Sequence, residues 1–423
     1  MRTRRRQPTA DTRRSVSAVM DVTAIAAGGD GVSRHEGLVV FTPRTAPGDR
    51  AAIDFAPGPR FARGTLRSLE TRSPDRVEPP CVHYTREKCG GCQLQHLSYE
   101  AQRTVKGRIV SDVLKRIGKR DVPPPEVHAS PAAWRYRSKL TLAMRRRGAQ
   151  WYAGLHPYDA PGRVFALDDC PITDERVLAV WREVLAHGAD LPDAVELRGA
   201  VRLEGDAASF ALEGGVSWPA SEKFFARVSS IASLWWTPEG GVRRRIGHRG
   251  AAAAPGPSFA QVNAALAPAL QRHALARAMA HRPGTLVDAY AGLGDTAAGA
   301  AEAGVRVTAI ELDEDAAAWC ATRLPPGSRV VAARVEDMLE GALPADVIVL
   351  NPPRAGVDAA VTALLETGAA ATRAVIYVSC DPATLARDLA RLPRWRIASL
   401  VCFDMFPQTA HVETVCELVP EAA

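Results

Sequence analysis

The first part of the chain alternates apolar and polar residues in short runs. Four such runs within residues 16–70 read "AVMDVTAIA", "GLVVFTP", "RAAIDFAP" and "ARGTLRSLE", with Gly, Pro and Asp turns between them. Short alternating strands bounded by turns predict a small β-barrel or sandwich. Small barrels of the OB kind commonly bind nucleic acid, so this segment favours a nucleic-acid partner.

A helical periodicity follows this β-like part. Residues 98–118 carry apolar side chains at helical intervals, which predicts a helix with one buried face: Val105, Ile109, Val110, Leu114 and Ile117. Residues 130–250 mix strand-like and helical runs without a clean period, and we interpret them as an α+β unit. The Ala-rich run at 249–257 predicts a linker to the last third of the chain.

The last third has the clearest pattern, because apolar strands alternate with helices. "TLVDAYAGLG", "VRVTAIELD", "ADVIVLNPPR" and "RAVIYVSCDP" are expected strands that end in polar loops, and "IASLVCFDMF" and "TVCELV" are two more. "DTAAGAAEAG" and "ATLARDLARL" are expected helices. This alternation predicts a parallel, doubly wound α/β sheet, whose ligands bind outside the carboxyl ends of the strands.

These patterns divide the chain into four expected segments. They are a basic disordered tail over 1–14, an OB-like barrel over 15–72, a central α+β domain with a cysteine cluster over 73–250, and a Rossmann-like domain over 251–423. The tail "MRTRRRQPTADTRR" contains six arginines, so an arm that contacts RNA and a transit peptide are the alternatives to a solvated tail.

The composition narrows the class of protein. A content of 47% hydrophobic and 24% charged residues is typical of soluble globular proteins, and no apolar run approaches the roughly 18 residues of a membrane helix. We therefore expect a cytoplasmic monomer that does not bind membranes. The net charge of +6 suits an anionic partner. Eight cysteines without a secretory signal favour a reducing compartment, where metal binding or catalysis explains their spacing better than disulfides.

A glycine loop and a spaced acid predict a cofactor site. Gly292 and Gly294 follow an expected strand and open an expected helix, so the backbone can approach a ligand closely. Glu311 ends the next strand, nineteen residues after Gly292, where a carboxylate can accept hydrogen bonds from a ribose diol. This pair fits both dinucleotide and S-adenosylmethionine enzymes. The rigid rim "LNPPRAG" is typical of methyltransferases and decides between them.

Cys380 predicts covalent chemistry at the same edge of the sheet. It follows the expected strand "AVIYVS" directly, beside Asn351, and the helix from Ala383 is expected to help keep its thiol ionised. A thiolate there can add to C6 of uracil and make C5 nucleophilic towards a methyl group. A base must then remove the C5 proton. Glu413 and His411 are the candidates, expected to alternate onto one face of a strand, and Glu413 is preferred.

These motifs resemble the RNA uracil-5-methyltransferase family, which forms 5-methyluridine in transfer and 23S ribosomal RNA. The resemblance covers nearly the whole chain and includes a TRAM-type barrel in "GDGVSRHEGLVVFTPRTAPGDR", then "CGGCQLQHLSYEAQ", "FAQVNA", "NPPRAG", "VSCDPATLARDL" and "FPQTAHVETV". It implies that Cys380 is the nucleophile and Glu413 the base. It also implies a set of residues that bind S-adenosylmethionine: Gln261, Tyr290, Glu311 and Asn351.

The sequence departs from the family pattern at three positions. Asn351 stands where the family usually has Asp, which keeps hydrogen bonding but removes a charge. Ala291 and Thr296 stand where the glycine loop usually has Cys and Phe. These changes motivate the alternative of an RNA-binding protein with a decayed methyltransferase domain. An amino-group methyltransferase is a third reading, which Arg354 after the two prolines and the cysteine nucleophile oppose.

Four other cysteines form an expected metal site. Cys81, Cys89 and Cys92 are spaced C-x7-C-x2-C, and Cys170 lies in "LDDCPI". Their spacing alone suits either zinc or an iron–sulfur cluster. The family resemblance implies a [4Fe–4S] cluster, which also favours ribosomal over transfer RNA as the substrate. The remaining cysteines lie in apolar runs and are expected in the core: Cys320, Cys402 and Cys416.

Overall fold

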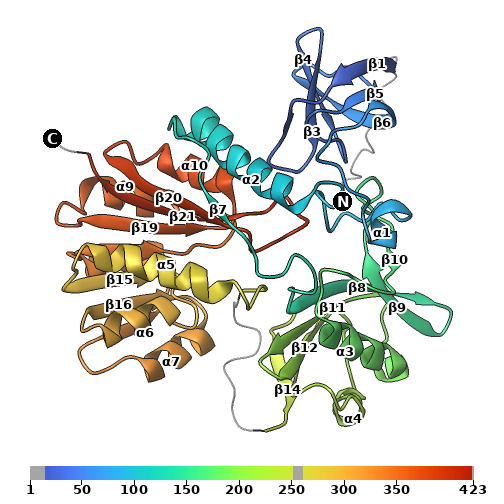
Figure 1. Cartoon of the computed structure of the whole chain (residues 1–423). Coiled ribbons are helices and arrows are strands. Elements are labelled where there is room, and N and C mark those ends of the chain that lie inside the picture. Colours follow the sequence, from blue (N-terminus) through green and yellow to red (C-terminus); the bar gives the residue numbers. More distant parts are fainter. Residues whose placement is uncertain (1–14, 251–260, 422–423) are drawn as a thin grey trace, which may run out of the picture.

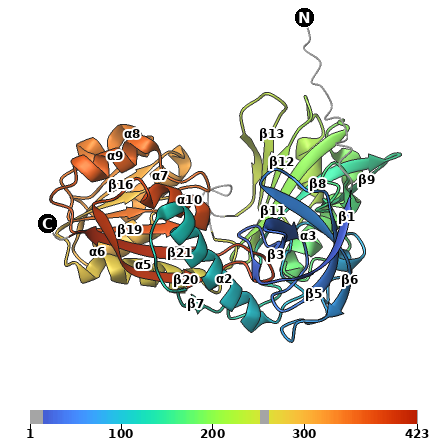
Figure 2. The same ribbon diagram turned by 90° about the horizontal axis from the view of Figure 1, so that it is seen from above.

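The computed structural model describes residues 15–250 and 261–421, and this part of the chain contains three β-sheets (Figure 1). Seen from above, the C-terminal sheet and its helices form one lobe, and the other two sheets form a second lobe (Figure 2). The expected tail at 1–14 and most of the expected linker at 249–257 lie outside the described residues.

The N-terminal sheet has six strands in the order β1-β5-β6-β4-β3-β2. The predicted runs are confirmed as strands, and β3 is an additional strand in the glycine-rich stretch between two of them. The bounds are β1 Val16–Asp21, β2 Ala24–Ile25, β3 Gly31–His35, β4 Leu38–Thr42, β5 Arg50–Phe55 and β6 Phe61–Thr71. Alternate side chains such as Val40, Ile53 and Phe55 are buried in a small core of their own.

The central sheet has seven strands in the order β10-β9-β8-β11-β12-β13-β14, and the α+β prediction is confirmed. A core rich in tryptophan lies between this sheet and α3, and it includes Trp181, Trp218 and Trp236. The bounds are α1 Val82–Thr85, β8 Lys139–Arg147, β9 Gln150–Leu155, β10 Phe165–Ala166, α3 Glu175–Ala186, β11 Glu196–Glu204, β12 Ala207–Glu213, α4 Ser221–Arg227, β13 Ser233–Thr237 and β14 Arg244–His248, with a 3₁₀ turn at Gly188–Asp190.

The C-terminal sheet has eight strands in the order β17-β16-β15-β18-β19-β21-β20-β7. Its strands are β7 Val127–His128, β15 Thr285–Ala289, β16 Arg306–Glu311, β17 Arg329–Ala332, β18 Val347–Leu350, β19 Ala374–Ser379, β20 Trp395–Phe403 and β21 Glu413–Pro420. The helices are α5 Ala267–Ala280, α6 Asp295–Glu302, α7 Glu314–Arg323, α8 Val335–Met338, α9 Ala359–Thr367 and α10 Pro382–Leu389, with a 3₁₀ turn at Glu340–Ala342.

Helices cover both faces of this sheet, as the doubly wound prediction requires. Neighbouring residues of one strand belong to different cores: Val287 packs with α9 and α10, whereas Leu286 packs with α5 and α6. Tyr377 and Ile376 divide in the same way. Strands that are buried on both faces are continuous apolar runs, which explains the clear sequence pattern.

The prediction of an all-parallel sheet is wrong at one strand. β21 is antiparallel to both β19 and β20, while β15, β16, β17, β18 and β19 pair in parallel. The first residue of β21 therefore lies at the sheet edge where β15, β18 and β19 end. The strand order reverses between β15 and β18, which is where an open α/β sheet binds its ligands.

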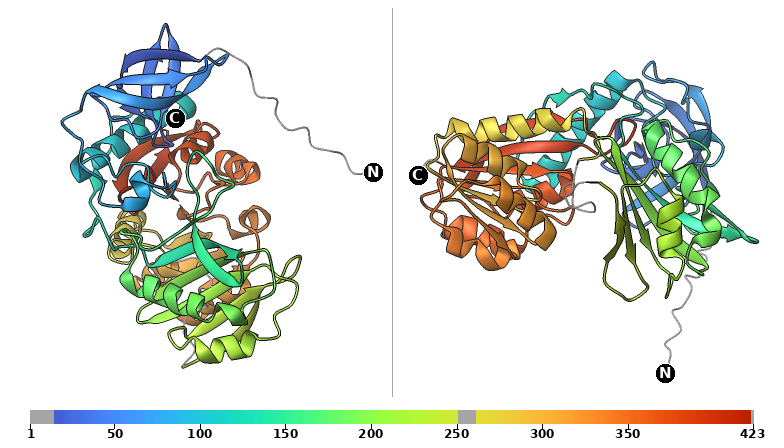
Figure 3. Two further views of the ribbon diagram at one scale, coloured as in Figure 1. Left: turned by 90° about the vertical axis from the view of Figure 1, so that its right-hand side faces the viewer. Right: turned by 90° about the horizontal axis from the view of Figure 1, so that it is seen from below.

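The helix predicted at 98–118 is confirmed as α2, Tyr99–Val113, which continues as a π-helical turn at Leu114–Gly118. Although it follows the cysteine segment in sequence, α2 packs against α10 and β7 of the C-terminal lobe, and Figure 3 shows it crossing between the lobes. Its Lys106 is completely buried. The Lys106 ammonium donates to Asp404 Oδ1 at 2.5 Å and to the Phe406 carbonyl at 3.0 Å.

The Lys106–Asp404 pair belongs to a segment with many partners, residues 404–412, which we call the junction segment. Its Gln408 carbonyl accepts from the backbone N–H groups of Gln93 and Leu94 at 3.1 and 2.9 Å. The segment has three other hydrogen-bond partners: Gln102 of α2, Tyr136 before β8 and Asn263 before α5. Segments far apart in the sequence thus meet on the residues that lead into β21.

Replacing Lys106 by Met should lower the free energy of unfolding by about 3–5 kcal/mol, because it leaves the Asp404 carboxylate buried without its partner. Chemical denaturation measures this loss. The double variant Lys106→Met/Asp404→Leu should recover much of it, since neither buried charge remains.

The exposed pair Lys115–Asp121, at 2.9 Å, provides the matched control. Lys115→Met should change the free energy of unfolding by less than about 1 kcal/mol, because solvent screens an exposed pair. Similar losses in Lys106→Met and Lys115→Met would contradict a special role for the buried pair.

Candidate active site

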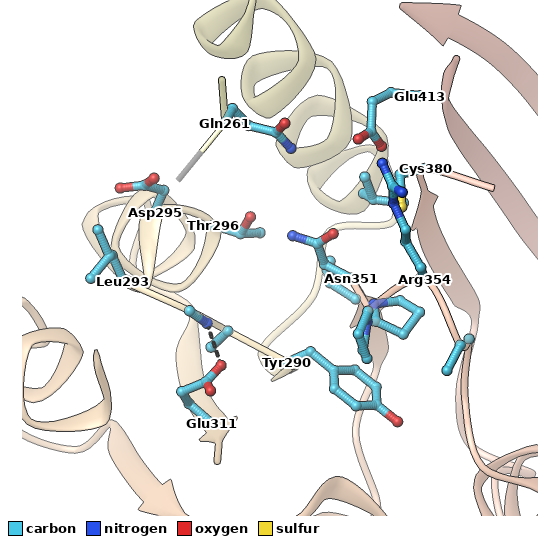
Figure 4. A pocket seen from close by; sticks show the side chains of 18 of the residues that line it. Gln261, Tyr290, Leu293, Asp295, Thr296, Glu311, Asn351, Arg354, Cys380 and Glu413 are labelled. Carbon is cyan, nitrogen blue, oxygen red and sulfur yellow. Dashed lines mark hydrogen bonds between the residues drawn. The ribbon is translucent and has the colours of Figure 1, made fainter. Parts of the chain in front are cut away.

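The residues expected to bind the cofactor or to react line a single cavity of about 1360 Å³: Gln261, Tyr290, Glu311, Asn351, Cys380 and Glu413. The cavity lies between the carboxyl ends of β15, β18 and β19 and residues of β8 and β11 in the central sheet. Figure 4 shows Glu311 at one end, Cys380 and Glu413 at the other, and Asn351 between them. A volume above the roughly 300–1,000 Å³ of ordinary ligand pockets leaves room for more than a cofactor.

Glu311 fixes the conformation of the glycine loop, at the end of the cavity farther from Cys380. One carboxylate oxygen of Glu311 accepts from the Gly292 N–H at 2.8 Å, and the other accepts from the Asp313 N–H at 2.8 Å. Gly294 has φ of 79°, and a Cβ there would lie 2.3 Å from the sulfur of buried Cys320. The loop therefore requires glycine at 294, and Cys320 is in the core as predicted, as are Cys402 and Cys416.

The "NPPRAG" loop after β18 is fixed to the helix that follows Cys380. The Thr384 hydroxyl donates to the Arg354 carbonyl at 3.0 Å, and the Asp388 carboxylate accepts from the Val357 N–H at 3.1 Å. Gly356 has φ of 79°, and a Cβ there would lie 2.3 Å from Thr384. This close approach couples the rim that carries Asn351 to α10.

Cys380 lies in a tight turn between β19 and α10. The Ser379 hydroxyl donates to the Asp381 carbonyl at 3.0 Å, and the Asp381 carboxylate accepts from the N–H groups of Ala383 and Thr384 at 2.9 Å. The turn aims the Cys380 side chain from the end of a rigid strand into the cavity.

Glu413 is brought beside Cys380 by the antiparallel direction of β21. Ser379 of β19 pairs with Thr414 of β21, and the Thr414 hydroxyl donates to the Ser379 carbonyl at 3.1 Å. Cys380 follows Ser379, and Glu413 precedes Thr414. Residues opposite each other on antiparallel strands have Cβ atoms about 4.5–5.5 Å apart, so this register makes the two side chains neighbours.

Burial sets the protonation of both groups. Burial raises the pKa of Glu413 to about 7, and the Arg354 guanidinium opposes this rise. Burial also raises the pKa of the Cys380 thiol to about 11, the Glu413 charge adds to the rise, and Arg354 again opposes it. The expectation that α10 keeps the thiol ionised is therefore wrong for the free protein. The carboxylate of Asp381 caps the N–H groups at the start of that helix.

Arg354 and Asp288 also line this site, although neither was predicted from the sequence to be a functional residue. Figure 4 shows the Arg354 guanidinium beside Cys380 and Glu413. Asp288 lines the cavity near the glycine loop, and its Oδ2 has no hydrogen-bond partner among the described residues. Burial raises the pKa of Asp288 to about 7. Its position as an acid within the apolar run "TLVDAY" could have identified Asp288 as a candidate functional residue.

The expectation that His411 shares a strand face with Glu413 is wrong. β21 begins at Glu413, and His411 lies before it in the junction segment. The His411 side chain is exposed and meets Phe406 edge-on. Among the two expected bases, only Glu413 lines the large cavity.

The four predicted ligand cysteines line one smaller cavity of about 160 Å³: Cys81, Cys89, Cys92 and Cys170. All four are buried, and burial raises the pKa of Cys89 to about 11 and also raises the pKa of Cys92 and Cys170. His83 Nδ1 and Gln95 Oε1, from residues that line the same cavity, have no hydrogen-bond partner within the described ranges. Within those ranges, no three His, Cys, Asp or Glu side chains are arranged to hold a metal ion.

Comparisons with known proteins agree with this architecture over nearly the whole chain. An uncharacterized RNA methyltransferase from Protochlamydia amoebophila is 30% identical, with 94% of this chain and 96% of the relative covered. Another, from Halalkalibacterium halodurans, is 32% identical, with 92% and 94% covered. Residues 329–419 match the sequence model of the tRNA (Uracil-5-)-methyltransferase family.

A solved structure shares the fold. The crystal structure of Pyrococcus abyssi tRNA (uracil-54, C5)-methyltransferase in complex with S-adenosyl-L-homocysteine has a TM-score of 0.71 and 22% sequence identity, covering 95% of this chain and 99% of its own. The strand order and the cavity at the carboxyl edge of the sheet define a class I methyltransferase-like fold. The chain belongs to the RNA methyltransferase family of its bacterial relatives. None of the described helices is long and apolar enough to cross a membrane.

Glu311→Gln should weaken the binding of S-adenosylmethionine by roughly tenfold to a hundredfold, because the neutral side chain loses one of two charge-assisted hydrogen bonds that shape the loop. Isothermal titration calorimetry measures the affinity. Glu314→Gln, an exposed change in the first turn of the next helix, is the matched control and should bind normally. Unchanged binding in Glu311→Gln would show that the loop does not hold the cofactor.

Proposed function

We propose that the chain transfers a methyl group from S-adenosylmethionine to C5 of a uridine in structured RNA. The main support for this proposal is that Cys380 and Glu413 are neighbours on adjacent strands. Both residues lie at the end of the cavity opposite the glycine loop. A nucleophile and a base on one side of the target and a methyl donor on the other are what the reaction needs. The match of residues 329–419 to a uracil-5 family supports the choice of base and ring position.

In the proposed reaction the Cys380 thiolate forms a bond to C6 of the uracil, and the electron pair of the C5–C6 double bond moves to C5 and the C4 carbonyl as an enolate. C5 then attacks the methyl group of the sulfonium and S-adenosylhomocysteine leaves. Glu413 takes the C5 proton, the double bond forms again, and the thiolate departs. A base with a pKa near the working pH serves this step best, and the raised pKa of about 7 for Glu413 satisfies that condition.

Arg354 supplies the positive charge that these steps require. Its guanidinium opposes the rise in the pKa of both Cys380 and Glu413, so it favours their ionised forms. With its pKa raised to about 11, the Cys380 thiol of the free protein is largely protonated at neutral pH. The charge of Arg354 favours the thiolate that the first step uses.

The cofactor would lie along the other half of the cavity. Glu311 is suited to accept from its ribose, and the amide groups of Gln261 and Asn351 are suited to hold its amino-acid end. The unpartnered Oδ2 of Asp288 provides one more acceptor for a cationic group. The neutral Asn351 keeps hydrogen bonding at that position, so we infer an active enzyme and not a decayed one.

We propose that the four buried cysteines hold a [4Fe–4S] cluster. The four cysteines line one cavity of about 160 Å³, to which the segment 81–92 and Cys170 both contribute. Fe–S clusters are bound by four cysteine thiolates, which matches the donor set. The group would cross-link the segment 81–92 to Cys170 and thereby serve a structural role.

The RNA substrate would contact both lobes. We propose that the N-terminal sheet is a TRAM-type, OB-like barrel that binds the RNA backbone, and that the target uridine is flipped out of its stack so that C6 becomes accessible. The cysteine cluster favours 23S ribosomal RNA over transfer RNA.

Two variants test the assignment of nucleophile and base. Cys380→Ala should abolish methylation and still bind RNA and cofactor, because only the covalent step is lost. Glu413→Gln should lower turnover by roughly 10²- to 10⁴-fold and accumulate a covalent protein–RNA adduct, because the C5 proton stays in place. Denaturing gel electrophoresis with labelled RNA detects the adduct.

His411→Gln is the control for the base, because it removes the other titratable group nearby without reaching the cavity. It should keep its turnover and trap nothing. Turnover by Cys380→Ala, or a Glu413→Gln variant that is inactive without an adduct, would refute the corresponding role.

The cluster has its own test. Protein purified without air should be brown and contain about four iron and four sulfide ions per chain, and both should vanish in Cys89→Ser/Cys92→Ser. Cys402→Ala, which removes a buried thiol elsewhere, should keep its colour. A colourless protein with one zinc per chain would contradict the proposal.

A further inference from the structure

The cavity has a second side that the proposed chemistry does not use. Opposite the ends of β15, β18 and β19, residues of the central sheet line it with positive side chains: Arg137, Lys139, Arg198 and Arg202. Arg137 precedes β8, Lys139 begins β8, and the other two belong to β11. We call these four residues the basic wall.

The sheet register concentrates these charges on one face. Lys139 is directly opposite Arg202 in the antiparallel pair β8–β11, and Thr141, which also lines the cavity, is opposite Ala200. Residues two apart on a strand point to the same face, so Arg198 and Arg202 project to the side of Lys139. Like charges directly opposite each other destabilise a sheet, and the fold therefore retains an arrangement that costs stability.

Lys139 lacks a compensating partner. Its ammonium makes no hydrogen bond or ion pair with any residue in the described ranges, although its side chain is half-buried. Arg198 pairs with Glu213 at 2.8 Å, and Arg137 uses its Nε to bind the Lys139 carbonyl at 2.8 Å. Burial, with the three arginines beside it, lowers the pKa of Lys139 to about 8, and Glu213 opposes this fall. An anion in the cavity would relieve both the desolvation and the repulsion.

The extent of the basic wall indicates what kind of anion fits. Arg198 and Arg202 are four residues apart on one strand, which corresponds to about 13 Å at roughly 3.3 Å per residue. A single carboxylate or phosphate does not span this distance, whereas consecutive phosphodiesters of a nucleic-acid strand do. The wall also lines the same cavity as Cys380, so a strand bound there would lie within the cavity that contains the reactive end.

We propose that the basic wall binds the phosphodiesters that flank the target uridine, with the ammonium of Lys139 as its central contact. This inference rests on the proposed function, because it takes RNA as the substrate. In this arrangement the central sheet binds the RNA backbone, and the C-terminal sheet binds the target uracil and the cofactor.

The test measures RNA binding without turnover. A fluorescein-labelled RNA stem-loop with uridine in its loop is titrated with the full-length protein, with S-adenosylhomocysteine present, over a series of KCl concentrations. Lys139→Gln should weaken binding by roughly tenfold to a hundredfold. The slope of log affinity against log salt should fall by about 0.7–0.9, which is the value for one lost phosphate contact.

Three further variants make the result specific. Lys139→Gln/Arg202→Gln should lower the slope by about twice as much as the single change. Lys139→Arg should restore binding, because an arginine keeps the charge. Lys223→Gln is the matched control: this central-sheet-domain lysine pairs with Asp190 outside the cavity, so its loss should leave the affinity and the slope unchanged.

The pH dependence gives an independent readout. Bound phosphate favours the ammonium form, so wild-type affinity should be full well below pH 8 and fall as the pH rises through that value. The charged groups that face Lys139 are Arg137, Arg198, Arg202 and Glu213. The fall should disappear in Lys139→Arg, since an arginine stays charged in this range.

The outcomes separate this inference from the proposed function. A Lys139→Gln variant with unchanged affinity and salt slope would overturn the basic wall even if uridine is methylated. Loss of S-adenosylhomocysteine binding in Lys139→Gln, with RNA binding intact, would assign the wall to the cofactor and also overturn it. Conversely, a wild-type protein that binds RNA through Lys139 but leaves uridine unmodified would refute the proposed reaction only.

Discussion

The site depends on how the chain enters β21, because this places Glu413 next to Cys380. Glu413 begins that strand, and the junction segment before it is fixed by the fully buried Lys106–Asp404 pair and by backbone hydrogen bonds from Gln93 and Leu94 to Gln408. Because β21 runs antiparallel to β19, its first residue lies at the edge where Cys380 ends the neighbouring strand. A parallel strand would carry the same residue to the opposite edge, and the Glu413 carboxylate would not lie beside the thiol.

The junction segment also connects the two cavities of the protein. Gln93 follows Cys92 directly, so the loop that carries three of the four clustered cysteines contacts the residues that lead to Glu413. Gly29 of the N-terminal sheet packs there as well, since a Cβ on it would lie 2.5 Å from Gln93. The proposed cluster, although far in sequence from Cys380, would therefore stabilise the loop that contacts the residues leading to Glu413.

The sequence predicted the elements of the sheet and the residues at its edge more reliably than their electrostatics. Strands buried on both faces are visible as continuous apolar runs, and the ends of such strands identify Cys380, Asn351 and Glu311. Strand direction is not encoded in such a run, so the antiparallel β21 was not predicted. His411 was expected on the same face as Glu413 because the strand was expected to include both residues, whereas it begins at Glu413. The ionisation of Cys380 could not be predicted either, because it depends on burial and on the carboxylate of Glu413. The basic wall was hidden because its residues come from two segments that only the β8–β11 register brings together.

In the proposed reaction a methyl group replaces the proton on C5 of uridine through Cys380 and Glu413. The most direct measurement uses RNA that carries tritium at C5 of its uridines, incubated with S-adenosylmethionine and the purified protein. One tritium should be released to water for each methyl group transferred, and neither event should occur with Cys380→Ala. Methyl transfer without release of tritium would place the new methyl group on another atom and contradict the proposed reaction.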